Sequence, residues 1–189
     1  MTHSEWLDRC DFAYVVHGED CYQETKDLGR FKMVKRTYGV STTDIIQRIL
    51  TKKNNHIPYK SNELYYPTIE KLEFYSHGCD GFNNYCDVWG KSFDNCLVKG
   101  SNINDFKLCV LVMGEFDLFH IGHIEQLHNI SKKYHGCKII VGSIEPQNES
   151  KDFSIMALKK RALCILNCKY VDGLILTPSD DLDTLKKKI

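Results

Sequence analysis

Hydrophobic positions in the last part of the chain alternate between two periods. Residues 108–113 form an uninterrupted apolar run, which predicts a buried strand that ends at Gly114. A helix at 121–133 is predicted next, because the apolar residues are then spaced three and four apart, at Ile121, Ile124, Leu127 and Ile130. The same alternation predicts a strand at 138–142, a helix at 155–167, a strand at 173–176 and the start of a helix at 181–189. Such alternation predicts an α/β fold with a parallel sheet.

The first part of the chain carries a shorter pattern of the same kind. An apolar strand is predicted at 12–17, and a helix is predicted from the spacing of Ile45, Ile46, Ile49 and Leu50. Ser41 or Thr42 is a natural cap for this helix, since their hydroxyls can accept from unpaired backbone N–H groups. Residues 51–105 show no sustained periodicity, apart from a short strand or helix near 69–75, and this predicts a linker. The predicted segments are therefore 1–50, 51–105 and 106–189.

Two histidines stand where the helix that follows strand 108–113 begins. His120 and His123 are three residues apart, so they lie on one face of the first turn. Backbone N–H groups and the helix dipole at such a position attract phosphate. Imidazoles beside a phosphate suit a reaction that builds negative charge on phosphorus. The alternative is a strand, turn and helix in which both histidines are structural.

The string G-x-F-D-x-x-H-x-G-H, at 114–123, resembles the signature of the cytidylyltransferase family, a branch of the H-x-G-H nucleotidylyltransferases. This resemblance implies a Rossmann-like parallel sheet and an attack on the α-phosphate of a nucleoside triphosphate. His120 and His123 would be catalytic, and Gly114, Phe116 and Asp117 would bind the nucleotide. Class I aminoacyl-tRNA synthetases share the four letters H-I-G-H, but the sequence has no Lys-Met-Ser-Lys-Ser loop.

Two further segments downstream are similar to the same family. Residues 151–156 look like its lysine segment, in which Lys151 would contact the nucleotide phosphates as a catalytic residue. Residues 158–175 look like its next helix and strand, in which Arg161 would bind the nucleotide. Lys160 and Gly173 depart from the family pattern, since acidic residues are common at both positions.

The first part of the chain resembles the family's second signature. R-T-x-G-V-S-T-T-D-I-I begins at residue 36, and His-Gly-Glu-Asp occupies 17–20. His17 and Asp20 would help to seat the substrate. The residues implied to bind the nucleotide are Arg36, Thr37, Gly39, Ser41, Thr42 and Thr43. The alternative is an ordinary capped helix.

The order of the two signatures is reversed relative to a single family domain. Residues 1–50 look like the C-terminal half of a first cytidylyltransferase domain, and 106–189 look like the N-terminal half of a second. Tandem domains of this kind are typical of the family members that act on phosphoethanolamine. The resemblance therefore implies CTP and phosphoethanolamine as substrates, Mg²⁺ bound with CTP, and pairing with a second such domain or a homodimer. Choline phosphate is the alternative substrate, and a catalytically incompetent interaction module is the alternative function.

Composition narrows these possibilities. Lys plus Arg and Asp plus Glu both number 25, so the net charge of zero gives no support for a nucleic-acid groove. No apolar stretch is long enough for a transmembrane segment, and no secretory signal is visible. The nine cysteines include no C-x-x-C pair, and neither they nor the histidines follow a metal-ligand spacing. A reduced, cytoplasmic chain is the expectation.

Overall fold

The computed structural model describes residues 4–18, 22–35, 37, 40–51, 67–77, 85–100, 108–144 and 154–176. By compactness the chain divides into two units, Met1–Gln47 and Arg48–Ile189.

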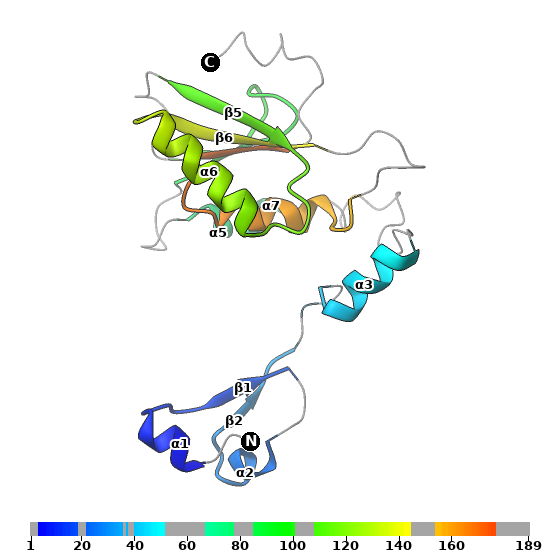
Figure 1. Ribbon diagram of the computed structural model, residues 1–189, viewed down its shortest axis with the longest axis vertical. Helices are drawn as coiled ribbons and strands as arrows, with labels where there is room; N and C mark the ends of the chain where they lie inside the picture. The colour runs from blue at the N-terminus through cyan, green and yellow to red at the C-terminus, as the bar shows by residue number, and fades with distance from the viewer. Residues whose placement is uncertain are drawn as a thin grey trace. The chain divides into compact units, whose positions relative to one another are not determined.

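The first unit is built around a two-stranded parallel sheet. Strands β1 (Val15–His17) and β2 (Phe31–Met33) pair in register, with Val15 opposite Phe31. Two short helices, α1 (Ser4–Arg9) and α2 (Gln23–Asp27), belong to this unit (Figure 1). Leu7 of α1 is buried, and the Arg30 guanidinium binds Asp8 and the carbonyl oxygens of Phe12 and Ala13. Helix α3 (Thr42–Thr51) begins in this unit and ends in the second.

The second unit contains a five-stranded sheet in the order β4-β3-β7-β6-β5. Its strands are β3 (Asp87–Trp89), β4 (Cys96–Val98), β5 (Cys109–Gly114), β6 (Lys138–Ser143) and β7 (Gly173–Leu176). Only the β3–β4 pair is antiparallel among the described strands. β5 pairs with β6 along its whole length and forms an edge of the described sheet.

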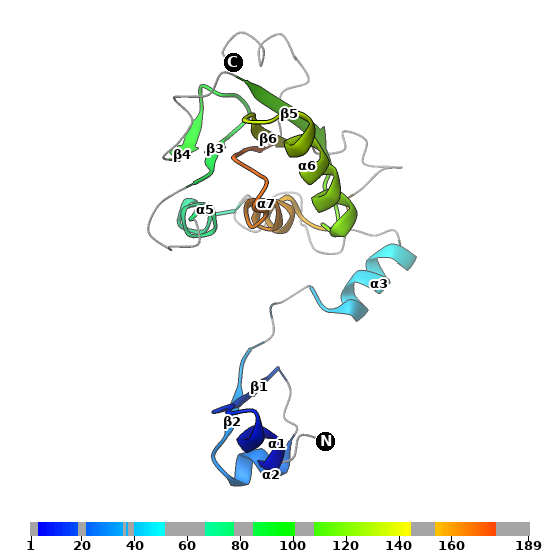
Figure 2. The ribbon, with the colours of Figure 1, turned by 60° about the vertical axis from the view of Figure 1, so that its left-hand side comes forward.

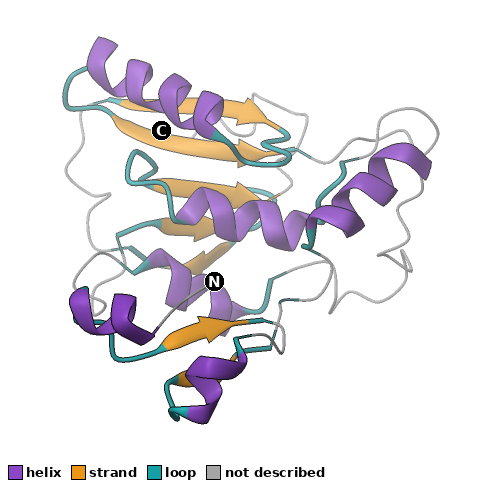
Figure 3. Cartoon of the chain, turned by 60° about the horizontal axis from the view of Figure 1, so that its bottom comes forward, coloured by secondary structure: helices purple, strands orange, loops and turns teal. Residues whose placement is uncertain are grey.

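Three helices cover one face of this sheet. Both views of the ribbon place α5 (Ile69–Ser76), α6 (Ile121–Lys133) and α7 (Leu158–Leu166) on the same side (Figures 1 and 2). Leu72, Leu127 and Ala162 from these helices pack against Val141 and Leu174 of the sheet in the main core. From β5 onward, strands and helices alternate along the chain in the order β5, α6, β6, α7 and β7, as the two hydrophobic periods predict. Figure 3 colours these helices and strands separately.

The α/β fold with a parallel-dominated sheet confirms the prediction. The predicted helix 121–133 and strand 173–176 have the observed bounds, and helix 155–167 is shorter, at Leu158–Leu166. The predicted helix at 181–189 lies outside the described residues.

The predicted linker is wrong where the structure describes it. α5 packs in the main core, and β3 pairs in parallel with β7, so residues 67–77 and 85–100 belong to the second unit and not to a linker at 51–105. All three residues of β3 are buried and the strand is short, so it shows no alternation in the sequence. β2, α1 and α2 of the first unit were also not predicted, because none exceeds six residues.

None of the helices that the structure describes is long and apolar enough to cross a membrane.

Candidate active site

The loop between β5 and α6 carries an unusual backbone. Phe116 and Leu118 both have positive φ angles, of 52° and 46°, which side-chain-bearing residues rarely adopt. Phe116 is nevertheless 5% exposed, and its ring lies over Gly114, where a Cβ would stand 3.1 Å from Phe116 Cε2. A side chain at residue 114 would therefore press against this buried ring. Strain of this kind persists when the surrounding packing fixes it, and it is frequent at functional sites.

The two histidines cap the start of α6 with their own rings. Nδ1 of His120 accepts from the backbone N–H of Gly122 at 3.0 Å, and Nδ1 of His123 accepts from the backbone N–H of His120 at 3.2 Å. The ring centroids lie 4.1 Å apart. These two backbone donors, which the sequence led us to expect on a phosphate, are thus occupied by imidazole nitrogens.

This capping fixes the tautomer of both rings. A nitrogen that accepts a hydrogen bond carries no proton, so in each neutral imidazole the proton sits on Nε2. The assignment rests on the hydrogen-bond partners of Nδ1. Both rings consequently offer an Nε2–H donor, and these donors replace the backbone N–H groups as candidates for contact with phosphate oxygens.

The surroundings of His123 favour its neutral form. Its ring stacks on Phe119 with centroids 5.4 Å apart and contacts Phe116 at 5.3 Å. Burial lowers the pKa of His123, the neighbouring His120 lowers it further, and the charge of Asp117 opposes both. A neutral His123 keeps its single proton on Nε2.

Gly122 is required by the position of the His120 ring. A Cβ at residue 122 would stand 2.9 Å from Cε1 of His120. Gly122→Ala should therefore fail to give the stabilisation of about 0.4–1 kcal/mol that Gly→Ala often brings, and it should displace the ring. Urea unfolding and the ring resonances of His120 measure the two effects. Asn129→Ala, at an exposed position of α6, is the control for helix propensity; a clear gain in stability at 122 would contradict the packing.

The pKa of His123 gives a second check on this geometry. Asp117→Asn removes the one charge that raises the pKa of His123, so the pKa should fall further below its ordinary value. Titration of the ring protons by NMR measures this. Glu125→Gln removes an exposed carboxylate elsewhere on α6 and should leave the titration unchanged. A rise in the Asp117→Asn variant would refute the assignment.

Asp117 ties the histidine loop to the segment before α7. Its carboxylate accepts from the backbone N–H groups of Leu118, Ile155 and Met156. Beside it, the Glu115 carboxylate accepts from the Ser154 hydroxyl at 3.2 Å. In this structure Asp117 therefore orders the backbone, and its predicted contact with the nucleotide stays a prediction.

Arg161 is buried among the backbone segments that surround the histidine loop. It is 1% exposed, and its Nη1 donates to the carbonyl oxygens of Glu115 at 2.6 Å and Ile144 at 3.0 Å and to the Ser143 hydroxyl at 3.2 Å. Its Nε donates to the carbonyl oxygen of Met156 at 3.0 Å. The guanidinium thereby joins the segments that follow β5 and β6 to the segment before α7. Its role here is structural, and direct binding of nucleotide stays a prediction.

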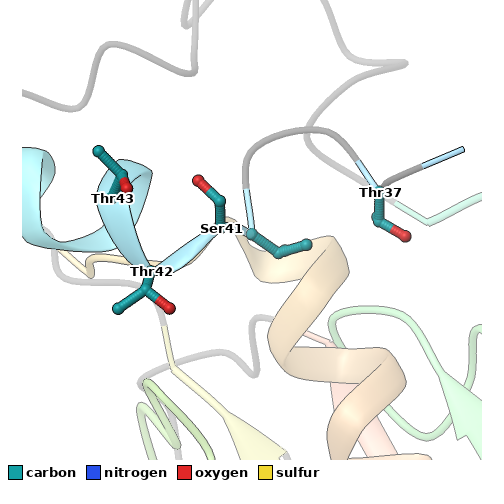
Figure 4. Close-up of a pocket in the computed structure, with 5 residues that line it drawn as sticks. Thr37, Ser41, Thr42 and Thr43 are labelled. Atoms are coloured by element: carbon teal, nitrogen blue, oxygen red, sulfur yellow. The ribbon is translucent and has the colours of Figure 1, made fainter. Parts of the chain in front are cut away.

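In the first unit, Ser41 caps α3 as predicted. Its hydroxyl accepts from the backbone N–H of Asp44 at 3.1 Å, and an Asp44 carboxylate oxygen accepts from the Ser41 backbone N–H at 3.4 Å. A cavity of about 370 Å³ adjoins this cap, and hydroxyl-bearing side chains dominate its lining (Figure 4). The lining residues are Thr37, Val40, Ser41, Thr42 and Thr43. Four of the predicted nucleotide-binding residues therefore surround one hollow, although Ser41 also serves the helix.

The remaining predicted residues divide into two groups. His17 ends β1, where its ring contacts Tyr22 with centroids 5.5 Å apart. The others, Lys151, Arg36, Gly39 and Asp20, lie outside the described residues. Sequence reasoning missed Ser154 and Arg48, because a lone serine before a helix and an arginine on an amphipathic helix carry no distinctive pattern.

Comparison with known proteins shows which proteins this chain is similar to. Residues 111–189 match the family model described as cytidylyltransferase-like. The chain is 44% identical over 185 residues to the ethanolamine-phosphate cytidylyltransferase of Saccharomyces cerevisiae, covering 93% of this chain and 56% of that protein. It is 28% identical to the probable ethanolamine-phosphate cytidylyltransferase of Schizosaccharomyces pombe, covering 92% of this chain and 51% of that protein. Choline-phosphate cytidylyltransferase 2 of Arabidopsis thaliana is 38% identical over only 65 residues, or 29% of this chain.

The paired histidines follow a strand of a parallel-dominated α/β sheet, and residues 111–189, which hold them, match the cytidylyltransferase-like family model. Within that family the chain is similar, over almost its whole length, to ethanolamine-phosphate cytidylyltransferases, which confirms the resemblance predicted from the motifs. The chain spans about half the length of these curated relatives.

Proposed function

We propose that this chain takes part in cytidylyl transfer from CTP to phosphoethanolamine, which gives CDP-ethanolamine and pyrophosphate for phosphatidylethanolamine synthesis. The observation that carries the proposal is the histidine pair, whose Nδ1 atoms are both occupied by backbone donors. Both imidazoles are thereby set to donate from Nε2.

The chemistry of the transfer needs such donors. A phosphate oxygen of phosphoethanolamine attacks the α-phosphorus of CTP, a new P–O bond forms, and the bond to the bridging oxygen of the leaving pyrophosphate breaks. Negative charge develops on oxygens around the α-phosphorus, and fixed N–H donors aimed at developing charge stabilise the transition state. Lys151 would neutralise a triphosphate bound beside the histidines, and the first signature would bind a triphosphate through Arg36, Thr37, Gly39, Ser41, Thr42 and Thr43.

The choice of phosphoethanolamine rests on the extent of similarity. Relatives named for ethanolamine phosphate match more than nine-tenths of this chain, whereas the choline-phosphate relative matches 29% of it. Asp20 and His17 would meet the substrate, the carboxylate of Asp20 suiting a primary ammonium group. Choline phosphate remains the alternative substrate.

Mg²⁺ would enter this site together with CTP. Mg²⁺ is commonly held by substrate phosphates and water with few protein ligands. Both carboxylate oxygens of Asp117 already accept backbone N–H bonds, which fits an ion held mainly by the triphosphate. The ion would neutralise charge on the phosphates.

The proposal also places the protein in the reducing cytoplasm and pairs it with a second cytidylyltransferase domain or a second copy. The seven cysteines that the structure describes are all free, which suits a reducing compartment. Pairing with a second cytidylyltransferase domain or with a second copy would supply the signature that each part of the chain lacks. The competing proposal is a non-catalytic module. It is favoured by the division of the chain, because the two signatures belong to different units.

Calorimetric titration of CTP with Mg²⁺ into the chain separates these proposals. Loss of binding in His120→Ala would assign a nucleotide site to the H-x-G-H segment, and loss in Arg36→Ala would assign one to the first signature. His128→Ala, elsewhere on α6, is the control. Loss in only one variant would assign the site to one signature, and absence of binding to the unaltered chain would overturn the enzymatic proposal in favour of the module. Assay of CDP-ethanolamine against CDP-choline formation then decides the substrate.

A further inference from the structure

The dipeptide Ile155–Met156, just before α7, is held by side chains from three other places in the sequence. Both of its backbone N–H groups donate to the carboxylate of Asp117. The carbonyl oxygen of Ile155 accepts from Arg48 Nη1 at 2.7 Å, and that of Met156 accepts from Arg161 Nε at 3.0 Å. All four backbone polar groups of the dipeptide are thus bound by side chains, which fixes its position more firmly than an ordinary loop.

Arg48 is almost fully buried, whereas the residues that follow it on α3 are exposed. It is 2% exposed, while its neighbours Ile49 and Leu50 on α3 are 45% and 77% exposed. Its Nη1 also lies 3.4 Å from Sδ of Met156. Burial of a guanidinium is unfavourable unless it is hydrogen-bonded. The bond from Arg48 Nη1 to the carbonyl oxygen of Ile155, within the second unit, therefore offsets part of the cost of burying this charge.

On its other side the dipeptide is joined to the histidines. Asp117, which binds both of its N–H groups, lies in the loop three residues before His120. The charge of Asp117 also acts on the ring of His123. A chain of direct contacts therefore runs from Arg48 through Ile155–Met156 to Asp117 and the histidine loop.

We propose that Arg48 is a positioning residue for the histidine pair, acting through the Ile155–Met156 dipeptide that Asp117 also binds. Arg48 would act by holding in place the backbone to which the Asp117 carboxylate is hydrogen-bonded. The proposal deepens the proposed function, since the positioned histidines are those assigned to the α-phosphate. Its physical content, the coupling of Arg48 to Asp117, is measurable without any nucleotide.

The test uses three variants of the full chain. Arg48→Met removes the guanidinium but keeps a long side chain, Arg48→Lys retains one charged donor, and Leu50→Ala is a control on the exposed side of α3. Amide hydrogen exchange at Ile155 and Met156 reports the dipeptide, exchange at the buried Leu127 of α6 reports the rest of the core, and NMR titration reports the His123 ring.

In Arg48→Met we expect exchange at Ile155 and Met156 to quicken by about tenfold, the loss of roughly one hydrogen bond, with exchange at Leu127 unchanged. The pKa of His123 should fall, because a loosened Asp117 raises it less. In Arg48→Lys, amide exchange at the dipeptide and the pKa of His123 should stay close to those of the unaltered chain. Leu50→Ala should change neither quantity. Unchanged exchange at the dipeptide, or equal acceleration at Leu127, would overturn the proposal.

CTP binding, measured in parallel, should weaken in Arg48→Met. If the unaltered chain binds no CTP, the proposed function fails, while the exchange result still decides the role of Arg48.

Discussion

Under the proposed function, replacement of His120 or His123 by Ala is expected to lower kcat for cytidylyl transfer by about 10²–10³-fold and to change KM for CTP far less. The reason is that an Nε2–H donor aimed at charge on the α-phosphate is strongest in the transition state, and loss of such an interaction acts on kcat. Rates of CDP-ethanolamine formation at limiting and saturating CTP separate the two constants.

A matched control for this experiment lies on the same helix. His128 stacks on Tyr170 with ring centroids 4.7 Å apart, outside the pair, and His128→Ala should leave kcat near its original value. Equal turnover in all three variants would exclude the histidine pair from catalysis. A loss confined to KM would instead assign the rings to ground-state binding.

Replacement of Arg161 by Leu is expected to destabilise the second unit by about 3–5 kcal/mol, the usual cost of removing one partner from a buried charged network. The change would leave the carbonyl oxygens of Glu115, Ile144 and Met156 without their donor. Urea unfolding followed by circular dichroism measures the effect. Lys169→Ala removes the same charge from an exposed position after α7 and should cost less than 1 kcal/mol. A loss of similar size in both variants would contradict the structural role of Arg161.

The parts of the fold that could be predicted are those with long, regular patterns. Helix α6 buries Leu127 and half-buries Ile124 and Ile130, so its period of 3.6 is visible, and β5 is apolar along most of its length. β3 and β4 are three residues long, too short to show a period, and they were predicted as part of a linker. The place of β3 in the sheet is decided by pairing with β7, a strand more than seventy residues away, which local sequence does not encode. β4 joins the sheet only through β3.

The candidate site shows the same division. The H-x-G-H spacing located the histidines and the glycine between them, because their roles are local to one helical turn. The sequence did not reveal that the rings would occupy the backbone donors of that turn, nor that Arg161 would be turned inward to three separate segments. Arg48 was missed altogether, since its partner lies 107 residues further along the chain.

The position of β5 at the margin of the described sheet has a consequence for handling the protein. Its residues, Cys-Val-Leu-Val-Met-Gly, include no charge and no proline, the two features with which natural proteins commonly block the addition of further strands. Short uncharged segments of high β-propensity are also those that join many chains into stacked sheets. Among the strands described, β5 is therefore the segment through which copies of this chain would begin to aggregate in concentrated solution.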